Sequence, residues 1–145
     1  MEKATLVFDA FVDCVKKTGF DFFVMKQNRK RLVIIELNNG RHLICLYRLN
    51  KNNDAVECGL LYEDKKASDV YAMYYWFVFY PFSENEIRKA IEYAERQIVE
   101  DEKEYIDCLQ GKIRTSTDYI PVEEYSDCYG KFIRQKKKLG WEMIE

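Results

Sequence analysis

The most continuous apolar stretch of the chain runs from residue 70 to residue 82, VYAMYYWFVFYPF, and carries no charged residue. Its aromatic and β-branched side chains favour extended backbone. Both alternating sets of positions are apolar, whereas a strand with one solvated face alternates apolar and polar residues. The pattern predicts a strand that is covered on both faces and on which the fold is assembled. Truncating Trp76 or Phe77 would then leave a cavity and cost several kcal/mol.

The segments that precede this strand predict a helix and four more strands. Residues 4–18 repeat apolar side chains at three- and four-residue spacing, which is typical of an amphipathic helix. Four strand-like segments follow, separated by residues that suit tight turns: Phe20–Lys26, Arg31–Leu37, Arg41–Leu49 and Ala55–Tyr62. With Val70–Tyr80, they predict a five-stranded antiparallel meander.

The loop Asn38–Gly40 sets the register of one predicted hairpin. If Gly40 is left-handed in a three-residue loop, Ile34 faces Ile44 and Leu32 faces Leu46. The same register places Glu36 across from His42. A four-residue loop at 50–53 would also make Cys45 and Cys58 neighbours, which we interpret as two small buried side chains rather than a redox pair.

The C-terminal part of the chain predicts two more helices. Pro81 ends the long strand because it has no N–H for the sheet. Ser83 and Glu86 form a capping box, which predicts a helix over Glu84–Gln110. Residues 112–119 are polar and predict a loop or a short edge strand. From Pro121 the spacing is helical again until Gly140.

The predicted fold is therefore a single α+β domain over residues 1–145, in the order α-β-β-β-β-β-α-α. The strands over 31–37 and 41–49 are apolar on both faces. The three predicted helices must therefore be divided between the two faces, or another chain covers one of them. A homodimer or an obligate partner is thus an open alternative.

Composition narrows the class of protein. The chain has 145 residues, 33% of them charged, and a net charge of −2, so it has no overall attraction to nucleic acid or to an anionic membrane. Its five cysteines are scattered without a CxxC pair, and acidic residues interrupt the N-terminal apolar positions. This pattern predicts a cytoplasmic protein without a signal peptide. The apolar stretch at 70–82 is too short and too rich in tyrosine to predict a membrane span.

Candidate chemistry is sparse. His42 is the only histidine, and a carboxylate such as Glu36 beside it could orient the ring as a general base. No nucleophile motif, phosphate-binding glycine loop or metal-ligand spacing accompanies this pair. We therefore expect a protein that is not an enzyme and that has no metal and no cofactor.

Charge is segregated along the chain. The second predicted helix is acidic. Two basic clusters contrast with it: Lys26, Arg29, Lys30 and Arg31, and Lys131, Arg134, Lys136, Lys137 and Lys138. Such a bipolar molecule could dock electrostatically on a charged protein. Alternatively, the basic clusters could bind RNA or DNA beside aromatic side chains.

Aromatic residues, which make up 15% of the chain, suggest an interface, since tyrosine gives large contact area at low entropic cost. We expect five of them to be exposed: Tyr62, Tyr71, Tyr119, Tyr125 and Trp141. Together with Lys26, Arg29, Lys30, Arg31, Lys136, Lys137 and Lys138 they form the predicted partner-binding set.

In size and composition the chain resembles phage-encoded or mobile-element anti-defence inhibitors, such as anti-CRISPR proteins, and toxin-immunity proteins. That resemblance implies a small inhibitor that occludes the functional surface of a larger protein, such as a nuclease. An immunity or adaptor protein, or an RNA/DNA-binding module using the clusters at 26–31 and 131–138, is the alternative.

Overall fold

The computed structural model describes residues 3–49, 54–64, 67–112 and 122–144. The elements are α1 (Lys3–Thr18), β1 (Phe22–Gln27), β2 (Lys30–Glu36), β3 (His42–Arg48), β4 (Ala55–Asp64), β5 (Asp69–Phe79), α2 (Glu84–Leu109), α3 (Val122–Lys138) and β6 (Glu142–Met143). The three helices and the five strands expected from the sequence are present, with ends that differ by a few residues. The expected loop or edge strand at 112–119 falls almost entirely outside the described residues.

The strands form one sheet in the order β5-β4-β3-β2-β1-β6. The antiparallel meander from β1 to β5 is confirmed. The expected count of five strands is one too low, because the chain returns after α3 and pairs β6 with β1, Met25 opposite Met143. This sixth strand is only two residues long, so hydrophobic periodicity carries almost no signal for it.

The predicted register of the β2–β3 hairpin is confirmed. Gly40 has a φ of 82°, and the Leu37 amide donates to the Arg41 carbonyl at 2.7 Å. Ile34 pairs with Ile44, and Leu32 pairs with Leu46. Only glycine adopts such a positive φ without strain, so Gly40 determines which side chains of both strands share a face.

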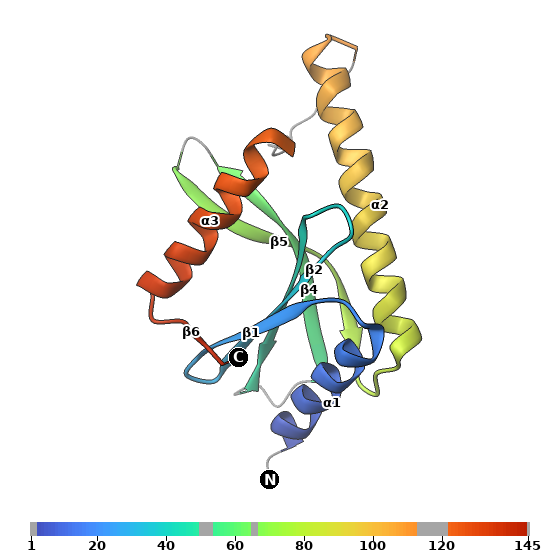
Figure 1. Cartoon of the computed structure of the whole chain (residues 1–145), viewed down its shortest axis with the longest axis vertical. Helices are drawn as coiled ribbons and strands as arrows, with labels where there is room; N and C mark the ends of the chain where they lie inside the picture. Colours follow the sequence, from blue (N-terminus) through green and yellow to red (C-terminus); the bar gives the residue numbers. More distant parts are fainter. Residues whose placement is uncertain (1–2, 50–53, 65–66, 113–121, 145) are drawn as a thin grey trace.

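The two faces of the sheet are covered by different helices. Figure 1 shows α2 and α3 on opposite sides of it. Val33, Ile35, Leu43 and Cys45 belong to the core that includes α1 and α2. Leu32, Ile34, Ile44 and Leu46 instead pack with α3. The chain therefore covers both faces of its central strands with its own helices.

The long apolar strand is not in the middle of the sheet. β5 is an edge strand, and Phe77 and Phe79 are 52% and 61% exposed. The prediction that both faces of this strand are covered is wrong for these two side chains, as is the expectation that truncating Phe77 creates a cavity. Trp76 and Val78 alternate with them and pack on the α1–α2 side.

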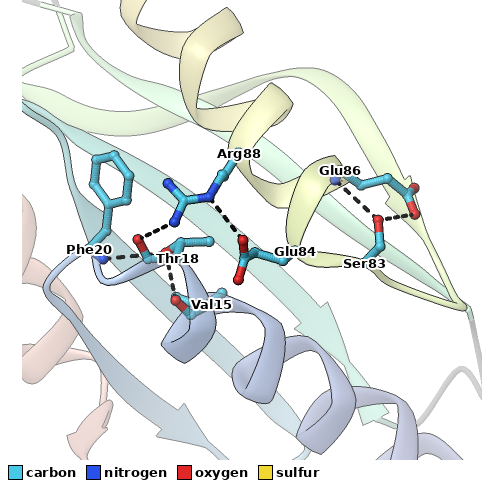
Figure 2. Close-up of polar contacts among 7 residues, drawn as sticks. All are labelled: Val15, Thr18, Phe20, Ser83, Glu84, Glu86 and Arg88. Atoms are coloured by element: carbon cyan, nitrogen blue, oxygen red, sulfur yellow. Dashed lines mark hydrogen bonds and ion pairs between the residues drawn. The ribbon is translucent and has the colours of Figure 1, made fainter.

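Polar contacts join α1 to the start of α2 (Figure 2). The Ser83 hydroxyl accepts a hydrogen bond from the Glu86 amide at 3.2 Å, which confirms the predicted helix cap. Arg88 donates through Nη2 to the Thr18 carbonyl at 3.0 Å and pairs with Glu84. A cation at the C-terminal end of α1 also suits the helix dipole.

Two further observations concern cysteine and membranes. All five cysteines are free, and Cys45 lies opposite Cys58 as the register predicted. Within the described ranges, none of the helices combines the length and the hydropathy that crossing a bilayer requires.

Candidate functional site

His42, the only candidate general base, has its side chain held by α3. The register places it opposite Glu36, as expected. However, its Nδ1 is hydrogen-bonded to the Tyr125 hydroxyl, with 2.8 Å between the two atoms, and its ring stacks on Tyr129 with centroids 3.8 Å apart. Burial lowers the pKa of His42 to about 4, whereas a carboxylate that pairs with the ring would raise this pKa. His42 is therefore neutral near pH 7.

Charged residues that sequence analysis did not single out lie beside His42. Arg41 is only 5% exposed and lies over the Tyr125 ring, 4.8 Å from its centroid. Asp101 of α2 accepts hydrogen bonds from the Tyr62 hydroxyl at 2.9 Å and from Gln97 at 3.0 Å. Burial raises the pKa of the Asp101 carboxyl, and the Gln97 hydrogen bond and the charge of Arg41 oppose this shift. Through Asp101 and Tyr125, respectively, α2 and α3 are joined to one end of the sheet.

The surroundings of His42 leave no room for a substrate. The cavity formed by His42, Tyr62, Asp101 and Tyr125 has a volume of about 10 Å³, which is about the space of one water molecule. Across the described ranges, no three His, Cys, Asp or Glu side chains are grouped so that they could hold a metal ion. The geometry around His42 is that of a packed structural site.

The aromatic residues expected at a partner surface have mixed positions. Tyr71 is 42% exposed, but Tyr62, Tyr125 and Trp141 are buried at 2%, 7% and 6%. The expectation of exposure is wrong for these three, because the helices on either side of the sheet cover them. Tyr119 lies outside the described residues.

The first basic cluster is divided by the alternation of a strand. Lys26 and Arg31 are opposite each other in neighbouring strands, next to positions that face α1. Lys30 lies opposite Gln27 in one neighbouring strand and opposite Arg48 in the other, on the face that carries α3. Arg31 donates to the Asn28 and Lys30 carbonyls and so braces the hairpin. Arg29 is exposed in the turn between the strands. The cluster therefore does not act as one surface.

Lys136 of the second basic cluster lies close to Lys30 of the first. The ammonium of Lys136 lies over the rings of Phe132 and Trp141, 5.2 and 5.4 Å from their centroids. Its pKa is lowered by burial and by the charge of Lys30, whereas Asp69 raises it. Lys137 and Lys138 are exposed, and Lys131 pairs with Glu63 at 3.4 Å. Of the predicted basic residues, Lys30 and Lys136 are brought together.

Lys30 and Lys136 line a groove between α3 and the sheet. This groove has a volume of about 460 Å³ and also contains Arg48 and Asp69. Arg48 is bound to Glu57 at 2.7 Å. We call this feature the basic groove. It joins segments more than 100 residues apart in sequence, and no local pattern predicts which lysine of each cluster reaches it.

A second groove runs between the edge strand and α2. It has a volume of about 640 Å³ and is lined by residues 76–79 of β5 together with Glu86, Lys89, Ala90, Glu92, Tyr93 and Arg96 of α2. Tyr93 is 38% exposed and contacts Trp76 edge to face, with centroids 4.8 Å apart. We call this feature the edge groove. The charge-free stretch at 70–82 is the signal of this groove in the sequence, although the same pattern also predicts a strand covered on both faces.

Comparison with known proteins adds no assignment: no family model, no curated protein and no solved structure gives a significant match to this chain.

Proposed function

We propose that this chain is a small non-enzymatic inhibitor that binds a larger protein, of the nuclease type, along the edge groove and occludes its functional surface. The observation that carries the proposal is the character of β5: a long edge strand without charge from Val70 to Tyr80, beside an open groove. Edge strands of monomeric proteins are normally protected by charged residues or proline. An unprotected one is a template for an added strand of a partner.

The side chains around the edge groove suit such a partner. Phe79, Tyr80 and Tyr93 are 61%, 44% and 38% exposed, and aromatic side chains dominate the energetics of protein interfaces. Lys89 and Arg96 alternate with Glu86 and Glu92 along the α2 wall. A partner therefore gains apolar contact from β5 and orientation from the charges of α2.

The charge of α2 favours a nucleic-acid enzyme as partner. Most of its exposed or half-buried charged side chains are acidic, including Glu92, Glu95, Glu100, Glu102 and Glu104. The surface with which a nuclease binds its substrate is basic. An acidic helix is complementary to such a surface and competes with the substrate for it.

The test is affinity capture from a bacterial lysate with the full chain, followed by a cleavage assay on the captured protein. Glu92→Lys combined with Tyr93→Ala reverses one acidic charge and removes the ring that α2 contributes to the edge groove. Glu104→Lys makes the same charge reversal on an exposed position of α2 outside the groove and serves as the control. We expect the wild type and the control to retain one stoichiometric partner and to inhibit its cleavage activity, and the groove variant to lose both.

Two results would overturn this proposal. One is a captured protein that the groove variant retains as well as the wild type does. The other is light scattering that shows a stable dimer of the wild type and a monomer of the groove variant, since a second copy would then occupy the edge groove.

A further inference from the structure

The face of the sheet that carries α3 is only partly covered by that helix. Trp76 and Val78 pack on the opposite side, so Phe77 and Phe79 project from this face. Their rings are neighbours, with centroids 6.4 Å apart, and both are more than half exposed. Two adjacent phenylalanines exposed on a sheet are unfavourable in water, and an apolar patch of this kind marks a binding site.

Positive charge lies on the same face, in the neighbouring strands. Phe77 pairs with Glu57 of β4, whose carboxylate binds Arg48 of β3. Arg48 in turn pairs with Lys30 of β2. Since adjacent strands are about 4.8 Å apart, this row spans roughly 15 Å from the rings to Lys30. It ends at the basic groove, where Lys136 approaches from α3.

Two of the cations at this end of the row, Lys136 and Arg48, are held in place by other side chains before any ligand binds. Lys136 is held over the Phe132 and Trp141 rings, and its ammonium is close enough to Lys30 for the two charges to repel. Glu57 neutralises Arg48, so the excess positive charge is that of Lys30 and Lys136, with Asp69 as the acidic neighbour. A bound anion would relieve the repulsion between the two lysines.

We propose that Phe77, Phe79, Arg48, Lys30 and Lys136 form a platform that binds single-stranded nucleic acid. Bases stack on the two phenylalanine rings, and the backbone phosphates run across the sheet to Lys30 and Lys136. Exposed rings on a sheet bind unpaired bases in this way, and cations beside them neutralise phosphate. A duplex does not fit this description, because its bases are already stacked on each other.

This inference goes beyond the proposed inhibitor function. Phe77 and Phe79 line the edge groove as well as the platform, whereas Lys30, Arg48 and Lys136 of the platform lie outside the edge groove. A variant without the two lysines therefore tests the platform alone. RNA and DNA share the phosphate and base chemistry that the platform recognises. The experiment therefore includes both.

The test is fluorescence anisotropy of labelled oligo(U) and oligo(dT) with the full chain, over a range of salt from about 50 mM upward. Lys30→Ala with Lys136→Ala removes the two cations. Lys16→Ala with Lys103→Ala removes the same charge from exposed positions of α1 and α2 and is the matched control. We expect this cation variant to bind at least tenfold more weakly. The slope of log K against log salt concentration should become less steep by about 1.4, the value for two lost phosphate contacts on a single strand. The control should match the wild type.

The rings are tested separately from the charges. Phe77→Leu with Phe79→Leu keeps apolar side chains but removes the stacking surface, and we expect roughly tenfold weaker binding with an unchanged salt slope. Phe77→Tyr with Phe79→Tyr keeps the rings and should restore affinity. Circular dichroism of each variant verifies that the fold is intact.

Three outcomes would overturn the proposal. The wild type could fail to bind either oligonucleotide at about 50 mM salt. The cation variant could bind as well as its matched control. Finally, a labelled poly-glutamate peptide could bind as tightly as the oligonucleotides, without loss in the leucine variant, which would identify the basic groove as a site for acidic protein segments. If none of these three outcomes is found, a preference between oligo(U) and oligo(dT) distinguishes RNA from DNA as the ligand.

Discussion

At the scale of single residues, burial decides the chemistry of His42. The strand register places Glu36 opposite His42. The imidazole ring nevertheless contacts α3: its Nδ1 is hydrogen-bonded to the Tyr125 hydroxyl, and Tyr129 stacks on it. Removing the imidazole from water disfavours its charged form. The residue therefore stabilises the junction of sheet and helix as a neutral side chain.

This shift makes stability depend on pH. The pKa of His42 is about 4 in the folded chain and about 6.5 when unfolded. Below pH 6.5 the unfolded chain binds the proton first, so the free energy of unfolding falls as the pH drops toward 4. With allowance for partial solvent screening, we expect His42 to account for about 2 kcal/mol of this loss.

Urea unfolding at several pH values between about 7 and about 4.5 measures this contribution. His42→Gln cannot titrate, so its stability should fall less than that of the wild type over this interval. Because every carboxylate is common to both proteins, the difference between the two profiles isolates the histidine. Parallel profiles would show that the ring is protonated as readily in the folded chain as in the unfolded one.

At the scale of elements, the first turn of α2 carries the polar contacts that cap this helix and connect it to α1. Ser83 caps it, and Arg88 ties it to the end of α1 (Figure 2). The helix is long and its exposed face is strongly acidic, so like charges repel along it. Its apolar positions, such as Ile87, Ile91 and Ile98, are buried against the sheet and provide most of its stability.

Loss of the cap should therefore be a moderate defect. Ser83→Ala leaves the Glu86 amide without its acceptor, and we expect the free energy of unfolding to fall by about 1 kcal/mol. Ser83→Asp supplies another acceptor and a charge that suits the helix N-terminus, so it should keep or slightly raise stability. Urea unfolding of the three proteins checks this order. An alanine variant as stable as the wild type would mean that tertiary contacts alone hold this turn.

At the scale of the whole molecule, charge of opposite sign is gathered on different elements. The net charge is −2, but α2 is acidic while Lys30, Lys136, Lys137 and Lys138 lie at the end where β1, β2 and α3 meet. Local fields of this kind act on charged partners even when the net charge is small. The α2 wall of the edge groove lies on the acidic part, and the lysines of the platform lie on the basic part.

We expect the chain to be retained at neutral pH and low salt by both an anion exchanger and a cation exchanger. The triple variant Lys136→Ala, Lys137→Ala, Lys138→Ala should pass through the cation exchanger and still bind the anion exchanger. Elution salt concentration measures the effect. A wild type that is not retained by the cation exchanger would show that the basic end is neutralised by its acidic neighbours.

The sequence alone determined the helices, the meander, the β2–β3 register and the cap of α2, because these depend on local periodicity and on single residues such as Gly40 and Ser83. It could not show that Phe77 and Phe79 of the last strand are exposed, since a strand apolar on both sides has the same pattern whether a helix, a partner or solvent covers it. Nor could it separate Lys30 from Lys26 and Arg31, or bury Tyr62, Tyr125 and Trp141. These outcomes were decided by the tertiary structure, because exposure and convergence depend on where distant helices pack.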